Sequence, residues 1–206
     1  MMAKVSRVAL AAAALGMAAS LATPAMAQAG DPAVAPVDAL DNGLLAIMKA
    51  GKAAGQAGRA QRIGAVIDRV FDIPLMTRLS VGPTWNTINP RDQAALVAGF
   101  RSLTVAQFAH NFDDYSGEKF VITPQVETRG GDKLVRTTLV IPGHAPEQLN
   151  YRLRDSGGGQ WKVIDVFFRN SISQLASRHA DFADTLGKGG APALIAHLNK
   201  LAAAPE

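Results

Sequence analysis

The sequence contains no cysteine. It therefore has no disulfide framework and no thiolate metal site, and it offers no cysteine to which a lipoprotein anchor could be attached. The fold must be held together by packing. With 206 residues, the chain is long enough to bury a substantial core.

Long apolar runs are also scarce. The most apolar run covers residues 8–21, about 14 residues, and is shorter than the roughly 20 that a membrane-spanning helix needs. Two basic residues precede it, and Ala25-Met26-Ala27 places small side chains at the positions that a signal peptidase reads. We predict a signal peptide over residues 1–27, cleavage before Gln28 and export of the protein. An uncleaved membrane anchor is the alternative.

The sequence has no cluster of lysine and arginine. The predicted leader carries two of the 21 basic residues, Lys4 and Arg7, and none of the 17 acidic ones, so the net charge falls from +4 to +2 on cleavage. The basic residues are scattered and are not interleaved with aromatic residues. We therefore expect no binding to nucleic acid.

Motifs for metals and for nucleophilic catalysis are missing too. The four histidines lie far apart, with neither an H-E-x-x-H spacing nor a G-x-S-x-G motif: His110, His144, His179 and His197. Gly157-Gly158-Gly159 lies between two predicted strands, so it indicates a hairpin turn and not a phosphate-binding loop. We therefore expect no metal site.

The first third of the chain is helical in pattern. Residues 28–37 are rich in proline, glycine and alanine and predict a flexible lead-in to one domain over residues 38–206. Apolar residues then recur at helical spacing over residues 40–48, before Gly51, and again over residues 63–71. These patterns predict two short amphipathic helices.

Two capping signals predict the next helices. Asp72 followed by Pro74 favours a short helix that continues to Leu79. Asn89-Pro90-Arg91-Asp92 favours the start of a long helix, because asparagine caps and proline fits the first turn. We expect this helix to end between Tyr115 and Gly117.

The period then changes to two. Four strands are predicted in an antiparallel meander separated by glycine-containing turns, over residues 120–127, 134–141, 148–154 and 160–168. A helix over residues 171–186, broken by Gly187, and a last helix over residues 192–203 follow them. The fold class is therefore α+β: a curved antiparallel sheet of about four strands, wrapped by N- and C-terminal helices, with an apolar cleft between the layers.

Asp165 lies within the apolar strand Val163-Ile164-Asp165-Val166-Phe167-Phe168, where an ionised carboxylate needs a partner. One interpretation is a structural carboxylate bound to an arginine or to backbone amides. The other is a general base in a sheet cavity, with Tyr115 or Tyr151 as a hydrogen-bond donor. Nearby, Asn170 is suited to a positive φ, and Ser171 or Ser173 is suited to cap the following helix.

The chain resembles the MlaC/Ttg2D (toluene-tolerance) family of periplasmic lipid carriers. The resemblance covers most of the predicted mature chain and rests on Ser80-Val81-Gly82-Pro83-Thr84-Trp85, Tyr151-Arg152-Leu153-Arg154, Trp161-Lys162-Val163-Ile164-Asp165-Val166, Ser171-Ile172-Ser173, Arg178, Phe182 and Gly189-Gly190. It implies a monomeric carrier in the periplasm that binds a lipid, and it implies neither catalysis nor a cofactor. The implied partners are an inner-membrane ABC-type transporter and an outer-membrane lipid protein.

Within this family the sequence is most similar to the HpnM subgroup, which is associated with hopanoid lipids. The similarity rests on residues 80–85, Thr104-Val105-Ala106, Asn111-Phe112-Asp113, Tyr115, Gly117-Glu118 and Ser171-Ile172-Ser173. The implied ligand is therefore a phospholipid or a hopanoid.

We predict that large side chains beside the cleft contact the lipid. They are Met76, Val81, Trp85, Phe100, Leu103, Leu139, Tyr151, Val166, Phe168 and Leu175. The two-residue repeat places Val166 and Phe168 on one face of the last strand, and Trp161, Val163 and Phe167 on the other. An ordinary filled core, an enzyme acting on a hydrophobic substrate and a partner-binding module remain the alternatives.

Overall fold

The computed structural model describes residues 30–169 and 171–205. The predicted signal peptide lies outside the described residues, and so does Asn170. None of the helices within the described ranges combines the length and the apolarity that crossing a membrane requires.

Two antiparallel helices open the domain. Helix α1 spans Val34–Ala50, a short 3₁₀ turn spans Lys52–Ala54, and α2 spans Gly55–Val70. Ordered structure was expected from Asp38, but α1 begins four residues earlier, and both Ala33 and Val37 are fully buried. The segment expected to be a flexible lead-in therefore contributes to the core.

The two capping signals are confirmed. Helix α3 spans Ile73–Val81, and the Asp72 side chain accepts a hydrogen bond from the Leu75 amide at 3.1 Å. Helix α4 spans Pro90–Asn111 after the 3₁₀ segment Gly82–Thr87, and Asn89 Oδ1 accepts from the Asp92 amide at 3.0 Å. The predicted C-terminus of this helix is wrong, because α4 stops at Asn111, before Tyr115.

The sheet is an antiparallel meander. Its strands are β1 (Lys119–Ile122), β2 (Glu127–Arg129), β3 (Asp132–Val140), β4 (Glu147–Asp155), β5 (Trp161–Phe168) and β6 (Ile172–Ser173). The order across the sheet is β1-β3-β4-β5-β6, and β2 also pairs with β3. The first predicted strand, 120–127, is therefore divided into β1 and β2, and the two-residue edge strand β6 was not predicted.

A bulge between Arg152 and Leu153 changes the alternation of β5. Tyr151 pairs with Val166, whereas Leu153 pairs with Val163, so both of these valines lie on the same face. Trp161 is also on this face, where the Lys133 ammonium lies 4.4 Å from the centre of its ring. The predicted placement of Trp161 and Val163 opposite Val166 is thus wrong, and only Phe167 keeps its predicted side.

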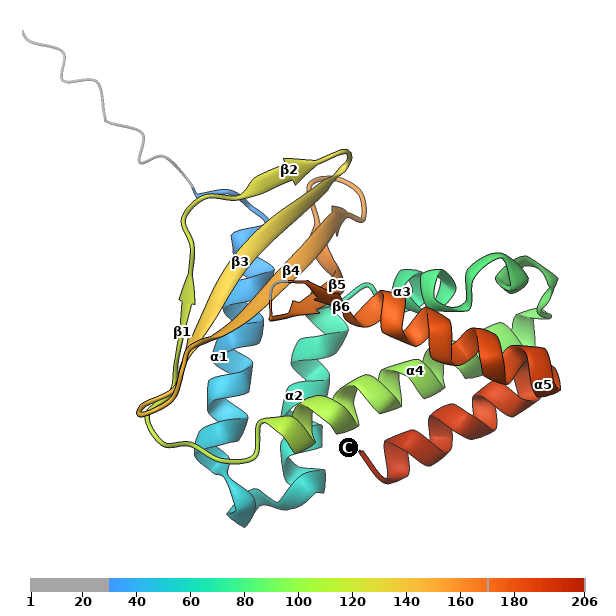
Figure 1. Cartoon of the computed structure of the whole chain (residues 1–206), viewed down its shortest axis with the longest axis horizontal. Coiled ribbons are helices and arrows are strands. Elements are labelled where there is room, and N and C mark those ends of the chain that lie inside the picture. Colours follow the sequence, from blue (N-terminus) through green and yellow to red (C-terminus); the bar gives the residue numbers. More distant parts are fainter. Residues whose placement is uncertain (1–29, 170, 206) are drawn as a thin grey trace, which may run out of the picture.

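The two faces of the sheet differ in burial. The inner face carries Val135, Leu149, Tyr151, Val163 and Val166, which are almost completely buried. It packs against the helical layer, and Figure 1 shows α1 and α2 crossing behind the strands while α3, α4 and α5 extend to one side. The outer face carries charged side chains and is partly open to solvent.

Helix α5 (Gln174–Ala203) is two arms joined by a kink. Ser173 caps its start by accepting a hydrogen bond from the Ala176 amide at 3.0 Å, as one of the two predicted caps. The break lies at Gly189 and Gly190, and not at the predicted Gly187; Gly190 has φ 64°. The second arm folds back beside α4 (Figure 1), where an added Cβ on Gly99 would lie 3.1 Å from Leu198 Cβ.

Candidate functional site

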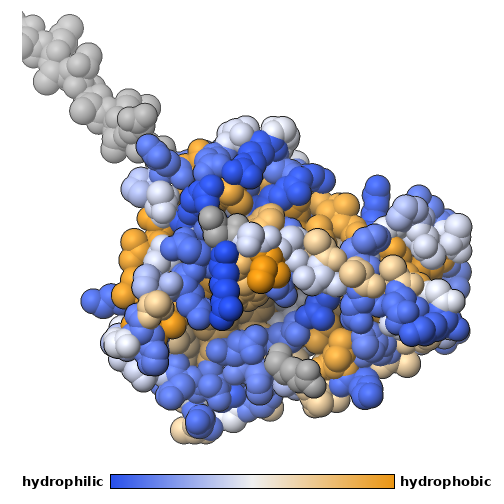
Figure 2. Space-filling view, in the orientation of Figure 1, coloured by the Kyte–Doolittle hydropathy of each residue, from blue (hydrophilic) through white to orange (hydrophobic). Residues whose placement is uncertain are grey.

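An apolar cavity lies between the inner face of β5 and the helices α3, α4 and α5. Its volume is about 210 Å³. The apolar part of its wall consists of Phe71, Met76, Phe100, Phe108, Phe112, Val166, Phe168 and Leu175. In the space-filling view a hollow opens near the middle of the molecule, with apolar colouring inside and hydrophilic residues around it (Figure 2).

Aromatic rings stiffen this wall. Phe71 and Phe108 meet edge to face with ring centres 5.7 Å apart, and Phe108 stacks on Phe112 at 5.9 Å. Phe100 meets the buried Phe182 of α5 edge to face at 6.1 Å. Such pairs add to the free energy gained by burying the rings, so the wall is held by specific contacts.

Polar side chains occupy one edge of the cavity, where α4 and the first arm of α5 approach each other. They are Thr104, Gln107, Asn111, Gln174 and Arg178. Arg178 Nη2 donates to Gln107 Oε1 at 2.5 Å. Burial lowers the pKa of the Arg178 guanidinium, and the field of Asp181 acts in the opposite direction.

A second recess of about 390 Å³ adjoins the first and shares Asn111, Phe112 and Phe168 with it. Its apolar residues are Met48, Leu139, Ile141 and Leu149, and its acidic residues are Asp113, Asp114, Glu118 and Glu147. Together the two recesses reach the ~300–1,000 Å³ range of small-molecule sites. The second recess is therefore lined by acidic residues, whereas the first carries a cation.

The structure places six of the ten residues predicted to contact a ligand in these two recesses. Met76, Phe100, Val166, Phe168 and Leu175 line the apolar cavity, and Leu139 lines the second recess. The remaining four, Val81, Trp85, Leu103 and Tyr151, line neither space. Tyr151 is fully buried beside Val166, and the 3₁₀ segment that carries Trp85 lies beyond α3.

The sequence reasoning missed Phe71, Phe108 and Phe112 and the whole polar edge. A signal for part of the wall was present, because Phe100, Thr104, Gln107 and Phe108 recur at helical spacing on α4. That spacing shows which side of α4 is shared by these residues. It does not distinguish a cavity wall from a filled core.

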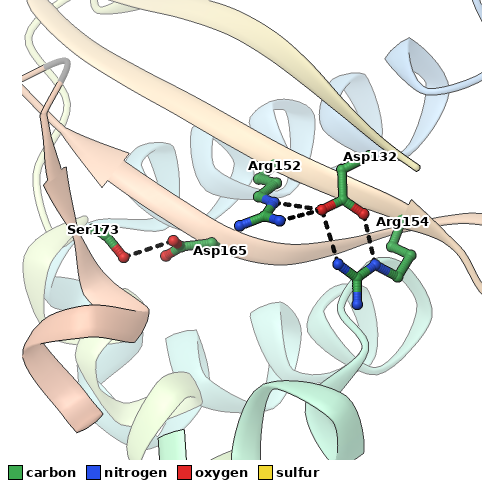
Figure 3. Close-up of polar contacts among 5 residues, drawn as sticks. All are labelled: Asp132, Arg152, Arg154, Asp165 and Ser173. Atoms are coloured by element: carbon green, nitrogen blue, oxygen red, sulfur yellow. Dashed lines mark hydrogen bonds and ion pairs between the residues drawn. The ribbon is translucent and has the colours of Figure 1, made fainter. Parts of the chain in front are cut away.

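Asp165 is held as a structural carboxylate. Its Oδ1 accepts from the Val166 and Leu175 amides at 2.8 and 3.0 Å, and its Oδ2 accepts from the Ser173 hydroxyl at 2.6 Å (Figure 3). Burial raises its pKa, and these three hydrogen bonds oppose that effect. Because Asp165 pairs with Arg152 across the strands, it belongs to the outer face and does not line the cavity.

The tyrosines proposed as partners of Asp165 lie elsewhere. Tyr115 is 38% exposed in the loop after α4. The Tyr151 hydroxyl lies 3.5 Å from Oδ1 of Asp41 on α1, at the limit of a hydrogen bond. The alternative in which Asp165 acts as a general base with a tyrosine as its hydrogen-bond donor is therefore not formed.

Asp41 is a second buried carboxyl, and its surroundings are poor in donors. Its Oδ2 has no hydrogen-bond partner within the described part of the chain. Burial, followed by repulsion from Asp38, raises the pKa of Asp41 to about 8, and the Tyr151 hydroxyl acts in the opposite direction. This group is therefore mostly protonated at neutral pH, which allows it to remain in an apolar layer.

The outer face carries a different arrangement. Asp132 accepts from Arg154 Nε at 2.6 Å and Arg154 Nη2 at 2.9 Å, and also from Arg152 (Figure 3). The hydrogen bonds from Arg154 hold the pKa of Asp132 below its usual range against the effect of burial, and Arg152 adds to them. In residues 30–169 and 171–205, no group of three or more histidine, aspartate or glutamate side chains is placed to hold a metal ion.

Comparisons with known proteins agree with this geometry. The family described as "MlaC protein" matches residues 38–200. A solved structure of a phospholipid-binding protein from Ralstonia solanacearum, in complex with a phospholipid, is 25% identical and superposes with a TM-score of 0.69. The alignment covers 83% of this chain and 97% of that one. No curated protein sequence matches.

Proposed function

The chain belongs to the MlaC family, and we propose that it is a periplasmic carrier that shields the apolar part of a lipid between two membranes. The observation that supports this most directly is the aromatic-walled cavity between β5 and the helices α3, α4 and α5. The similar protein from Ralstonia solanacearum binds a phospholipid, which makes a phospholipid the first candidate ligand. A hopanoid is the second candidate, from the resemblance to the HpnM subgroup.

The energetic requirement on such a carrier is large. At ~0.8 kcal/mol per buried CH₂, moving a chain of about 16 carbons into water costs on the order of 10 kcal/mol. A carrier must replace most of the apolar surroundings that the chain leaves. Rings such as Phe100 and Phe108, together with Val166 and Leu175, provide that contact area.

We also propose the route by which the lipid travels. The predicted signal peptide would deliver the protein to the periplasm, where family resemblance supplies an inner-membrane ABC-type transporter and an outer-membrane lipid protein as partners. The carrier acts as a monomer. The proposal includes no catalytic step, since Asp165 makes three hydrogen bonds within the fold and does not line the cavity.

Native mass spectrometry tests the proposal directly. Mature protein purified from the periplasm should carry an adduct of lipid mass, and solvent extraction followed by lipid analysis should identify it. Stripped protein should regain one lipid when mixed with phospholipid vesicles. Protein that leaves the periplasm without lipid, and that takes up neither phospholipid nor hopanoid from vesicles, would contradict the carrier function.

A further inference from the structure

Arg178 is an unusual residue in the wall of an apolar cavity. Its guanidinium is half-buried, and among the described residues that line this cavity it is the only cation. It donates one hydrogen bond, to the neutral side chain of Gln107. Across the described residues no carboxylate lies within 4 Å of it, and Asp181 acts only through its field.

Such a group requires an anion. An arginine has five N–H donors and remains charged in proteins, so a partly desolvated guanidinium with one neutral partner leaves most of its donors unused. Its planar fork binds two oxygens of one anionic group through parallel hydrogen bonds. Gln107 fixes the orientation of this fork, and the amide side chains of Asn111 and Gln174 line the same edge.

The acidic lining of the second recess determines where an anionic head group can bind. Asp113, Asp114, Glu118 and Glu147 surround the second recess and would repel an anion there. An anionic head group on a lipid whose tails fill the aromatic cavity is therefore favoured at the edge between α4 and α5.

Resting on the proposed carrier function, we infer that Arg178, oriented by Gln107, binds the phosphoryl group of a phosphate-bearing lipid at this edge of the cavity. The site makes the protein selective for phospholipids over uncharged lipids with the same tails. A hopanoid without an anionic group leaves Arg178 unused. The same chemistry would hold free phosphate or a fatty-acid carboxylate, so these are separate arms of the test.

Displacement of a neutral fluorophore, N-phenyl-1-naphthylamine, from the mature full-length protein measures the affinities. The competitors are dioleoylphosphatidylglycerol, dioleoylglycerol with identical tails, oleic acid and inorganic phosphate. We expect wild-type protein to prefer the phospholipid over dioleoylglycerol by about ten- to hundredfold, as charge-assisted hydrogen bonds allow. Inorganic phosphate should displace nothing, and oleic acid should bind more weakly than the phospholipid.

Three variants isolate the role of the guanidinium. Arg178→Gln should reduce the preference to about onefold to threefold and leave the affinity for dioleoylglycerol unchanged. Arg178→Lys keeps the charge without the fork and should retain an intermediate preference. Arg62→Gln removes an exposed arginine from α2 and should behave as wild type. Melting curves identify any variant that fails to fold. If Arg178→Gln does not fold, the lipid preference of Arg178→Lys is compared with that of wild type instead.

The outcomes separate the two proposals. If wild type binds both dioleoyl lipids equally and Arg178→Gln does not change this, the phosphoryl site is wrong and the carrier function stands. If isothermal titration calorimetry shows that inorganic phosphate binds wild type but not Arg178→Gln, or if oleic acid displaces the fluorophore as tightly as the phospholipid, the assignment to a lipid phosphoryl group is overturned. If no lipid displaces the fluorophore, the carrier function fails as well.

Discussion

The two faces of the sheet surround buried carboxyl groups with different numbers of hydrogen-bond donors. On the outer face, Asp132 and Asp165 are surrounded by donors from arginines, amides and a hydroxyl. Under the inner face, Asp41 has one weak partner, and its Oδ2 has none among residues 30–169 and 171–205. Asp132 on the outer face can therefore remain a charged carboxylate, whereas Asp41 in the inner layer is mostly protonated at neutral pH. This contrast separates a hydrogen-bonded, charged face from the apolar layer that contains the core and the cavity.

Adjacent phenylalanines on β5 give the sharpest test of this comparison and the largest expected effect. Phe168 faces the cavity, and Phe167 lies on the outer face beside Arg152 and Arg129. Phe168→Asp places an unpaired carboxylate against an apolar tail, so co-purified lipid should fall at least about tenfold. Phe167→Asp meets arginines and should keep its lipid.

Quantitative extraction of both purified variants, with circular dichroism to show that they are folded, decides this prediction. Equal lipid occupancy in the two folded variants would mean that Phe168 does not contact the ligand. Loss of lipid from Phe167→Asp alone would place the ligand on the outer face.

The second effect concerns Asp165. Asp165→Asn replaces one carboxylate oxygen with an NH₂ group, which cannot accept the hydrogen bonds that this oxygen receives in wild type. The substitution should lower the free energy of unfolding by about 2–4 kcal/mol. Lipid occupancy in the folded variant should not change. Urea unfolding measures the loss. Unchanged stability together with loss of turnover of a lipid substrate would instead favour an enzyme with Asp165 as its acid or base.

The third effect is a pH dependence that belongs to Asp41. Its pKa of about 8 in the folded protein exceeds that of an unfolded aspartate, so its contribution to stability is complete at acid pH and is lost as pH rises towards 8. Between pH 5.5 and 7 this amounts to about 1.4 kcal/mol per pH unit, or about 2 kcal/mol. Asp41→Asn should remove that slope, and identical slopes in denaturant titrations of the two proteins would exclude a raised pKa.

The smallest effect is expected at the arginine cluster. Asp132→Asn removes the shared partner of Arg152 and Arg154, but both guanidinium groups are about 40% exposed, so solvent screening limits the loss to about 1 kcal/mol or less. Since the pKa of Asp132 is lowered in the fold, this contribution is present above the unfolded pKa and disappears as the solution becomes more acidic. A thermal melt at pH 7 and pH 3 checks it, and a difference that grows at pH 3 would contradict it.

Much of the element order follows from local signals in the sequence. Asp72 and Asn89 cap helices through their own side chains, and glycine-containing turns separate the long strands, so these features depend on near neighbours alone. The end of α4 was placed too late because Phe112 and Tyr115 extend the apolar pattern beyond the last helical residue. In the structure Phe112 and Tyr115 lie in the segment that follows α4.

The site was less accessible from sequence, for two physical reasons. The run from Val163 to Phe168 is almost continuously apolar, so nothing in it reveals the bulge that returns Trp161 and Val163 to the inner face. The cavity wall also combines elements that are far apart in sequence, from Phe71 to Arg178, and pairing them requires the tertiary fold. The five wall residues that were predicted lie on the last long strand or on helices expected to pack against the sheet.

Helix α5 follows the whole sheet in the sequence, which sets the order in which the cavity can be completed. The meander can form early, because each long strand pairs with its neighbour in sequence. The cavity cannot, since Leu175 and Arg178 belong to α5, which follows the sheet in the sequence, and the Leu175 amide is also one of the donors to Asp165. Until α5 docks, the rings of Phe100 and Phe108 remain open to water in a chain that has already built its sheet. The ability to hold a ligand thus appears only after α5 docks, and a chain interrupted before residue 174 exposes an aromatic surface in place of the cavity.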